Sequence, residues 1–147
     1  MAEFMLHGDV DRPATLSVAD LREWEQHRME VVFDCAANGP QHHVFEGALL
    51  RDVVSGAGPV FDAGRRKDRS RFLLSVSGGD GHHTVLARAE LDADFVGSPV
   101  LPATRLDGEG LDETGAQLVV PSDRCGAARY VSAVTHVWFG ALGAPGA

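Results

Sequence analysis

Short apolar runs alternate with glycine- and proline-rich turns along most of the chain, a pattern typical of a β-rich domain. Stretches rich in β-branched and aromatic residues predict strands over 30–34, 44–47, 72–77, 84–88, 100–106, 117–120 and 130–139. In the last of these, Val131 and Ala133 alternate with Ser132, which indicates a sheet with one buried face. Glycine-containing breakers at 79–81 and 107–110 predict hairpin turns.

Two short helices are predicted between these strands. Ser17 followed three residues later by Asp20 resembles a capping box, and a helix should run from there through Trp24. The apolar residues between 49 and 54 share one face of a second helix, which Gly56 and Gly58 end. Because the regular strand–helix alternation of a doubly wound sheet is missing, the fold class predicted is α+β, dominated by β-structure.

The chain has 147 residues, which suits one domain. We expect residues 1–7 to be a disordered leader, with Met1–Phe4 an appended segment, residues 8–140 the domain, and residues 141–147 a flexible tail. No apolar run approaches the roughly 18 residues of a membrane span. The absence of an export signal predicts a cytoplasmic protein with reduced cysteines.

Charge argues against a nucleic-acid partner. The net charge is −8 with histidine neutral, whereas nucleic-acid binders usually carry a basic stripe. The one dense basic run, residues 65–71, is either a solvated loop or a local site for a small anion.

Sequence motifs leave Cys35 as the most interesting single residue. The chain has no Gly-x-Gly-x-x-Gly dinucleotide motif, no Walker A motif and no Gly-x-Ser-x-Gly elbow. Cys35 follows a predicted strand directly and begins a turn that contains Asn38, Gly39 and Pro40. Its thiolate could serve as a soft metal ligand or a nucleophile, and the alternative is a buried small hydrophobic residue.

Histidines and arginines offer further candidate groups. His42–His43 and His82–His83 are adjacent pairs, so each pair can give at most one ligand to a given site. Together with Cys35 they would make a three-ligand metal site; otherwise they are surface histidines near turns. Arg124 and Arg129 flank a glycine-containing loop and either hold an anion or lie in an ordinary turn.

Three segments, taken in order and spacing, resemble the oxidoreductase molybdopterin-binding domain of sulfite oxidases and assimilatory nitrate reductases. The first, 8–21, has the Gly, acidic turn and Pro that lead into an Asp-Leu helix. The second, 32–53, is similar to the strand and turn that carry the cysteine ligand of molybdenum. The third, 98–131, runs from a Leu-containing strand through a Val-Pro turn to a Gly-Ala-Ala-Arg loop.

The resemblance implies a β-rich fold with a mixed sheet, and a molybdopterin cofactor whose molybdenum is bound by Cys35. Asn38 and Gly39 would shape the turn beside the pterin dithiolene. Candidate cofactor contacts are Cys35, Asn38, Gly39, His42, Arg124, Gly126 and Arg129, and candidate catalytic residues are Cys35, His43 and Arg124. The family's chemistry is oxygen-atom transfer with two-electron redox at the metal, which the cofactor carries.

Departures from the family pattern keep a second hypothesis open. Residues 40–43 replace arginines that the family often has, and Ser132–Ala133 stand where Lys-Trp is expected. One hypothesis is a small molybdenum oxidoreductase with a small-molecule substrate and a redox partner protein. The other is a cofactor-free member that binds an organic small molecule, as a binding module or a non-redox enzyme such as a cyclase or isomerase. That second pocket would use Asp34, Cys35, His42, His43 and Arg124. A structural or partner-binding role is a third reading.

Overall fold

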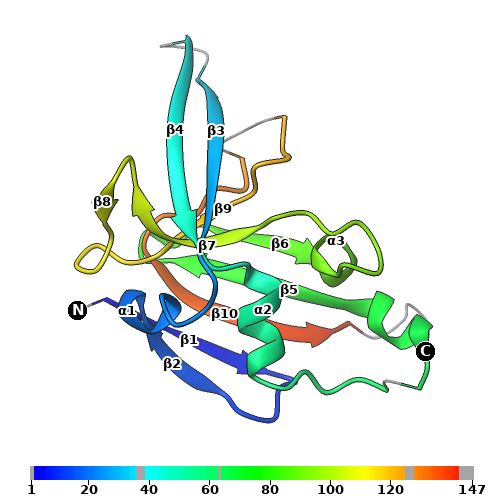
Figure 1. The fold of residues 1–147 in the computed structure, drawn as a ribbon. Coiled ribbons are helices and arrows are strands. Elements are labelled where there is room, and N and C mark those ends of the chain that lie inside the picture. The colour runs from blue at the N-terminus through cyan, green and yellow to red at the C-terminus, as the bar shows by residue number, and fades with distance from the viewer. Residues whose placement is uncertain (1, 36–38, 63, 125–127, 143–147) are drawn as a thin grey trace.

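The computed structural model describes residues 2–35, 39–62, 64–124 and 128–142 and contains two five-stranded sheets (Figure 1). The first sheet has the order β2 (Ala14–Ser17), β1 (Glu3–Gly8), β10 (Val134–Ala141), β5 (Phe72–Gly78) and β6 (His83–Ala87). The second has the order β3 (His27–Cys35), β4 (Gly39–Gly47), β7 (Leu101–Leu106) and β8 (Glu109–Gly110), with β9 (Gln117–Val119) also on β7. β1 and β10 are parallel, whereas their other neighbours pair antiparallel, so the first sheet is mixed as predicted.

Helices are few and short: α1 (Val18–Leu21), α2 (Leu50–Gly56), α3 (Arg88–Leu91) and the 3-10 helix η1 (Arg66–Arg71). α2 lies across one face of the first sheet (Figure 1). The core gathers between them: β5 buries every second residue, and Leu50 and Val53 of α2 are buried as well. This confirms the β-rich α+β class, and β5 shows the alternation of a sheet with one buried face. The alternation at Val131–Ala133 that suggested it is not part of a strand, because β10 begins at Val134 and Ala133 has a φ of 50°.

The predicted capping box and hairpin turns are present in the structure. The capping box forms, because Ser17 Oγ accepts the Asp20 N–H at 3.1 Å and Asp20 Oδ2 accepts the Ser17 N–H at 2.9 Å. The helix nevertheless ends at Leu21, before Trp24. The predicted hairpins join β5 to β6 and β7 to β8, and the second turn holds Asp107 at φ 50°.

The prediction that residues 1–7 lie outside the fold is wrong. Glu3–Gly8 is the strand β1, placed between β2 and β10, and Phe4 and Leu6 are only 3% and 1% exposed. Because the parallel partner of β1 lies about 130 residues away in the chain, the local pattern gave no sign of this pairing. At the other end Ala141 belongs to β10, and most of the predicted tail, 143–147, lies outside the described residues.

In the described part of the chain, no helix combines the length and apolar character needed to cross a membrane.

Candidate functional site

The hairpin of β3 and β4 carries most of the candidate residues. Its strands pair antiparallel from His27–Gly47 to Cys35–Gly39, and it rises above the rest of the fold (Figure 1). β7 pairs with β4 only near the base of the hairpin, through Phe45, Glu46 and Gly47. Cys35 therefore stands at the far end of β3. Only its backbone is described, and Asn38 lies outside the described residues.

An aromatic cluster fastens this hairpin to the segment before β10. The cluster consists of Phe33, His43, Phe45 and Tyr130, with ring centroids 5.0 Å apart for Phe33 and Tyr130 and 5.5 Å for Phe33 and His43. The Tyr130 hydroxyl hydrogen-bonds Gln117 Oε1, and burial raises the pKa of Tyr130. Near neutral pH the tyrosine is therefore a protonated donor that ties the segment to β9.

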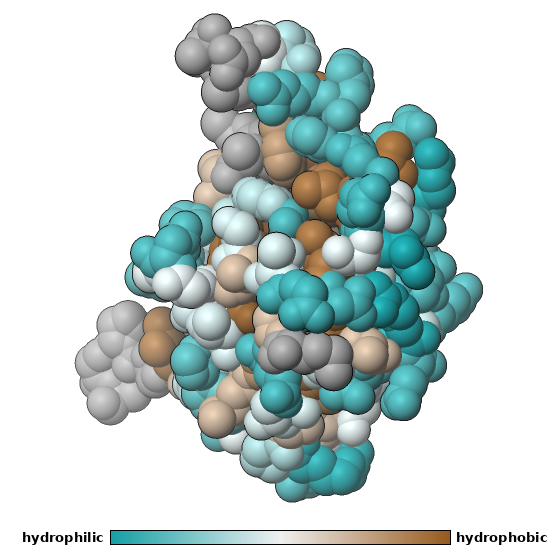
Figure 2. Space-filling model, turned by 90° about the vertical axis from the view of Figure 1, so that its left-hand side faces the viewer, coloured by the Kyte–Doolittle hydropathy of each residue, from teal (hydrophilic) through white to brown (hydrophobic). Residues whose placement is uncertain are grey.

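Figure 2, viewed from the left-hand side of Figure 1, shows hydrophobic residues at the surface in the upper half of the molecule, where the hairpin lies. Val32 of β3 is one of the large hydrophobic residues of the chain with substantial exposure, at 44%. β3 is also an edge strand, since β4 is its one neighbour among the described strands. The hairpin thus combines an apolar surface with an open backbone edge.

His43 forms a hydrogen bond with Asp107, a residue predicted from the sequence only to belong to a hairpin turn. Its Nδ1 lies 2.8 Å from Asp107 Oδ2, and Asp107 Oδ1 accepts the Val44 N–H at 2.8 Å. These hydrogen bonds, the backbone one first, lower the pKa of Asp107, so this carboxylate is ionised. An ionised aspartate on Nδ1 leaves Nε2 for acid–base work. His43 and Asp107 are 64 positions apart in the chain and meet because β4 pairs with β7. A local sequence pattern cannot predict this contact.

The register separates Cys35 from His43. Cys35 pairs with Gly39, and His43 lies four residues further along β4, which corresponds to about 13 Å of strand. The two residues are therefore not within reach of each other as nucleophile and base. His42 is exposed on the opposite face of β4. The second histidine pair lies at the start of β6, at the edge of the other sheet, with both residues exposed.

The possible three-ligand metal site includes Cys35, whose side chain lies outside the described part of the chain. Among the described residues, no group of three His, Cys, Asp or Glu side chains could hold a metal ion.

Arg129 does not face an open anion site. Its Nη2 and Nε donate to both oxygens of Asp123 at 2.7 and 2.9 Å, and its Nη1 donates to Glu90 at 2.9 Å. Hydrogen bonds to Asp123 and Glu90 raise the pKa of Arg129 despite its partial burial. The guanidinium of Arg129 therefore links the loop that contains Asp123 to Glu90 of α3. Because two carboxylates accept its hydrogen bonds, it is not available to a further anion. Arg124 is exposed in the same loop, and Gly126 lies outside the described residues.

The basic run 65–71 is not an open cationic loop either. Arg69 pairs with Asp92 and Asp94, and Arg71 pairs with Asp68, within and beside η1. η1 lies at the start of β5, directly before Phe72. The residues that follow Tyr130, Val131 and Ser132, pack against Gly78 at the other end of β5. Six residues of strand correspond to about 20 Å. These arginines therefore lie far from the aromatic cluster at the hairpin.

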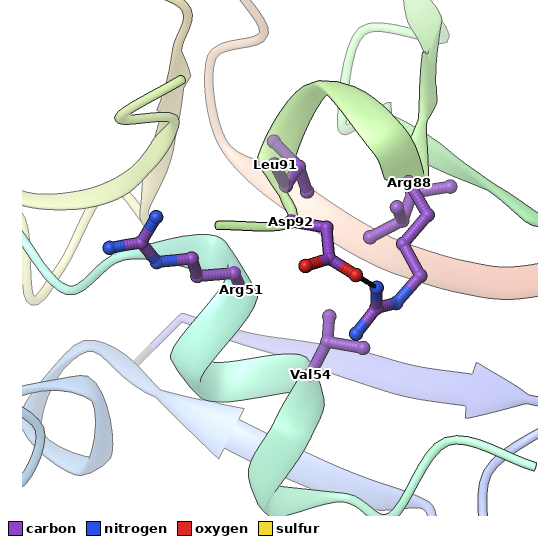
Figure 3. Close-up of a pocket in the computed structure, with 6 residues that line it drawn as sticks. Arg51, Val54, Arg88, Leu91 and Asp92 are labelled. Carbon is purple, nitrogen blue, oxygen red and sulfur yellow. Dashed lines mark hydrogen bonds and ion pairs between the residues drawn. The ribbon is translucent and has the colours of Figure 1, made fainter. Parts of the chain in front are cut away.

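A small cavity between α2 and α3 is closed by its own ion pair (Figure 3). Arg88 bonds Asp92 across it, and the guanidinium of Arg51 points away. Burial acts to raise the pKa of Asp92, but the Asp94 N–H and the Arg88 guanidinium outweigh burial and lower it. The volume of about 10 Å³ suits at most a single water molecule. This cavity is not a ligand site.

Comparisons with known proteins agree with the fold. The family described as the oxidoreductase molybdopterin binding domain has a sequence model that matches residues 2–122. The crystal structure of the sulfane dehydrogenase SoxCD from Paracoccus pantotrophus superposes with a TM-score of 0.71 at 18% sequence identity. The superposition covers 94% of this chain and 38% of that chain, so the chain spans well under half of that neighbour. No curated protein matches the sequence significantly.

Proposed function

Because the chain belongs to the oxidoreductase molybdopterin-binding domain family, we propose that it binds the molybdenum cofactor and that Cys35 is the protein ligand of the metal. The observation that carries the proposal is the position of Cys35 at the outer end of β3, opposite Gly39 of β4. A cysteine at such a strand end can present a thiolate, and the positive charge of a metal favours the deprotonated form.

The residue types of the hairpin and of the loop with Arg124 suit the metal end of this cofactor better than its phosphate end. Thiolate sulfur is a soft ligand that suits a transition metal. A terminal phosphate carries about two charges and calls for several charge-assisted donors. Arg129 is held by Asp123 and Glu90, which leaves Arg124 as the described cationic contact in this loop, with Gly39 and His42 as candidate contacts on β4.

When bound, the cofactor would supply two-electron oxygen-atom transfer, with a small-molecule substrate and a redox partner protein to exchange electrons. The residues of the chain would keep the cofactor-binding hairpin and the loop that carries Arg124 in place relative to each other. Contact between Phe33 and Tyr130 keeps the loop that carries Arg124 against the hairpin. The aromatic cluster also excludes water from the base of the hairpin, since Phe45 is fully buried.

A cofactor-free role is the second candidate, and the pairing of Arg129 favours it. If no phosphate is bound, the two carboxylates on Arg129 need no rearrangement. The acid–base group would then be His43 oriented by Asp107, beside the rings of Phe33 and Phe45, and the ligand would be an organic small molecule.

Molybdenum and pterin content decides between these proposals. The full chain would be purified from a host that makes the cofactor, and metal would be measured by mass spectrometry alongside released pterin. We expect stoichiometric molybdenum in the wild type and in Cys125→Ser, the matched control, and its loss in Cys35→Ser. Retention of the metal in folded Cys35→Ser would contradict the ligand assignment. Folded wild-type protein without metal or pterin would leave the cofactor-free role.

A further inference from the structure

A second binding site lies away from the hairpin, where β1, β2, α2 and the residues after α1 meet. These elements lie at the lower end of the fold in Figure 1. Their side chains line an open cavity of about 220 Å³. Leu6, Leu16 and Val53 form its apolar floor, while Ala14, Trp24 and Arg12 stand around it. For scale, a dry engineered cavity of about 150 Å³ is filled by benzene. This cavity therefore has room for a six-membered ring with one small substituent.

Two donors stand at the rim beside Gly56. Arg12 Nη2 donates to the Gly56 carbonyl at 3.0 Å, which uses one of the donors of its guanidinium. A methyl group built on Gly56 would lie 3.2 Å from Trp24 Cζ2 and 3.7 Å from Trp24 Nε1, so the indole edge faces the same point. Trp24 enters the hydrogen bonds of the described residues only through its backbone, and its ring N–H is left as a donor.

Arg12 brings a positive charge to this rim. Six other arginines pair with carboxylates, namely Arg22, Arg28, Arg69, Arg71, Arg88 and Arg129. Among the described residues Arg51, Arg65, Arg105 and Arg124 share with Arg12 the lack of an ion pair, but Arg12 is the one of these five that lines this cavity. Arg12 makes no ion pair within the described residues, although Asp9 and Asp11 lie in the same turn. A guanidinium and an indole N–H that point at one rim can share a carboxylate, while the apolar floor takes the ring.

We propose that this cavity binds a small aromatic carboxylate, whose ring lies on Leu6, Leu16 and Val53 and whose carboxylate accepts from Arg12 and Trp24. The site is independent of the molybdenum cofactor, because none of its residues belongs to β3, β4 or the loop of Arg124.

Tryptophan fluorescence tests the proposal directly. The chain has two tryptophans, so Trp138→Phe leaves Trp24 as the sole reporter inside the cavity. Benzoate should change this emission saturably, and Arg12→Gln should weaken benzoate binding about tenfold or more, as expected for loss of a charge-assisted pair. Benzamide, its neutral analogue, should bind both proteins with affinities within about twofold, because its contacts do not depend on the charge.

Filling the cavity supplies the second arm. Ala14→Leu and Leu16→Phe should each abolish the benzoate response in protein whose circular dichroism is unchanged. Arg28→Gln on the exposed part of β3 is the matched charge control and should bind as the parent does. Absence of a saturable response, equal losses in Arg12→Gln and Arg28→Gln, or full binding in both filled variants would overturn the proposal.

Discussion

Truncating Phe4 measures how far the N-terminal strand belongs to the core. Phe4 is 3% exposed in β1 and faces the core, whereas its neighbour Met5 is 46% exposed on the opposite face. Replacing a buried phenylalanine with alanine removes its apolar surface and leaves a cavity, at a cost of about 3–5 kcal/mol. Met5→Ala is the matched control and should change the free energy of unfolding by less than about 0.5 kcal/mol.

Urea unfolding followed by circular dichroism is the assay. A loss of 3–5 kcal/mol should lower the midpoint concentration clearly while leaving the slope of the transition unchanged. In a thermal scan the same loss corresponds to roughly 10 °C, because 1 kcal/mol shifts the melting temperature of a domain of this size by about 2–4 °C. Equal stability of Phe4→Ala and Met5→Ala would refute the placement of β1 in the sheet and would restore the idea of a leader.

Three further outcomes test the site. Because folding lowers the pKa of Asp107, its stabilisation is present above the ordinary carboxyl pKa of about 4 and is lost as the pH falls through the lower folded value. The stability difference between wild type and Asp107→Asn, from urea titrations at several pH values, should therefore shrink toward acid pH; a constant difference would contradict the pairing. Ultraviolet titration of Tyr130, the one tyrosine, should give a midpoint above about 10, and a midpoint below 10 would contradict its burial. Arg129→Gln should cost about 1–3 kcal/mol in urea unfolding, since it leaves two carboxylates without their partner; Arg124→Gln, an exposed neighbour, should not, and equal effects would refute the double pairing.

Patterns within one strand or one helix end were sufficient to predict much of the fold. The capping box at Ser17 and the hairpin turn at Asp107 involve residues close in sequence, and both form. The strand β1 was not predicted from such patterns, because its burial depends on pairing with β10 at the far end of the chain. A pattern of two buried residues, Phe4 and Leu6, is too short to distinguish a strand from a leader without that partner.

The candidate site divides in the same way. The sequence predicted Cys35 directly after a strand, and the structure has it as the last residue of β3. His43 was predicted to lie before the strand 44–47, whereas β4 already begins at Gly39 and includes it. Their separation could not be foreseen, because it depends on the register that pairs Cys35 with Gly39. Nor could the partner of His43, since Asp107 reaches it across the sheet from a turn 64 residues later.

Arginine in a sequence says little about anion binding until its neighbours are known. Arg69 and Arg129 come from segments that resemble anion sites by composition, yet each donates to two carboxylates of the same domain. Such a pair resists a phosphate, because an incoming anion must displace ionised partners that already satisfy the guanidinium. Arg12, in a turn that composition alone would dismiss, keeps its charge available beside an apolar cavity. The surplus of carboxylates behind the net charge of −8 therefore acts locally, because it neutralises arginines such as Arg69 and Arg129. Arg12 has no ion pair among the described residues, so an anionic ligand gains more there than at a paired arginine.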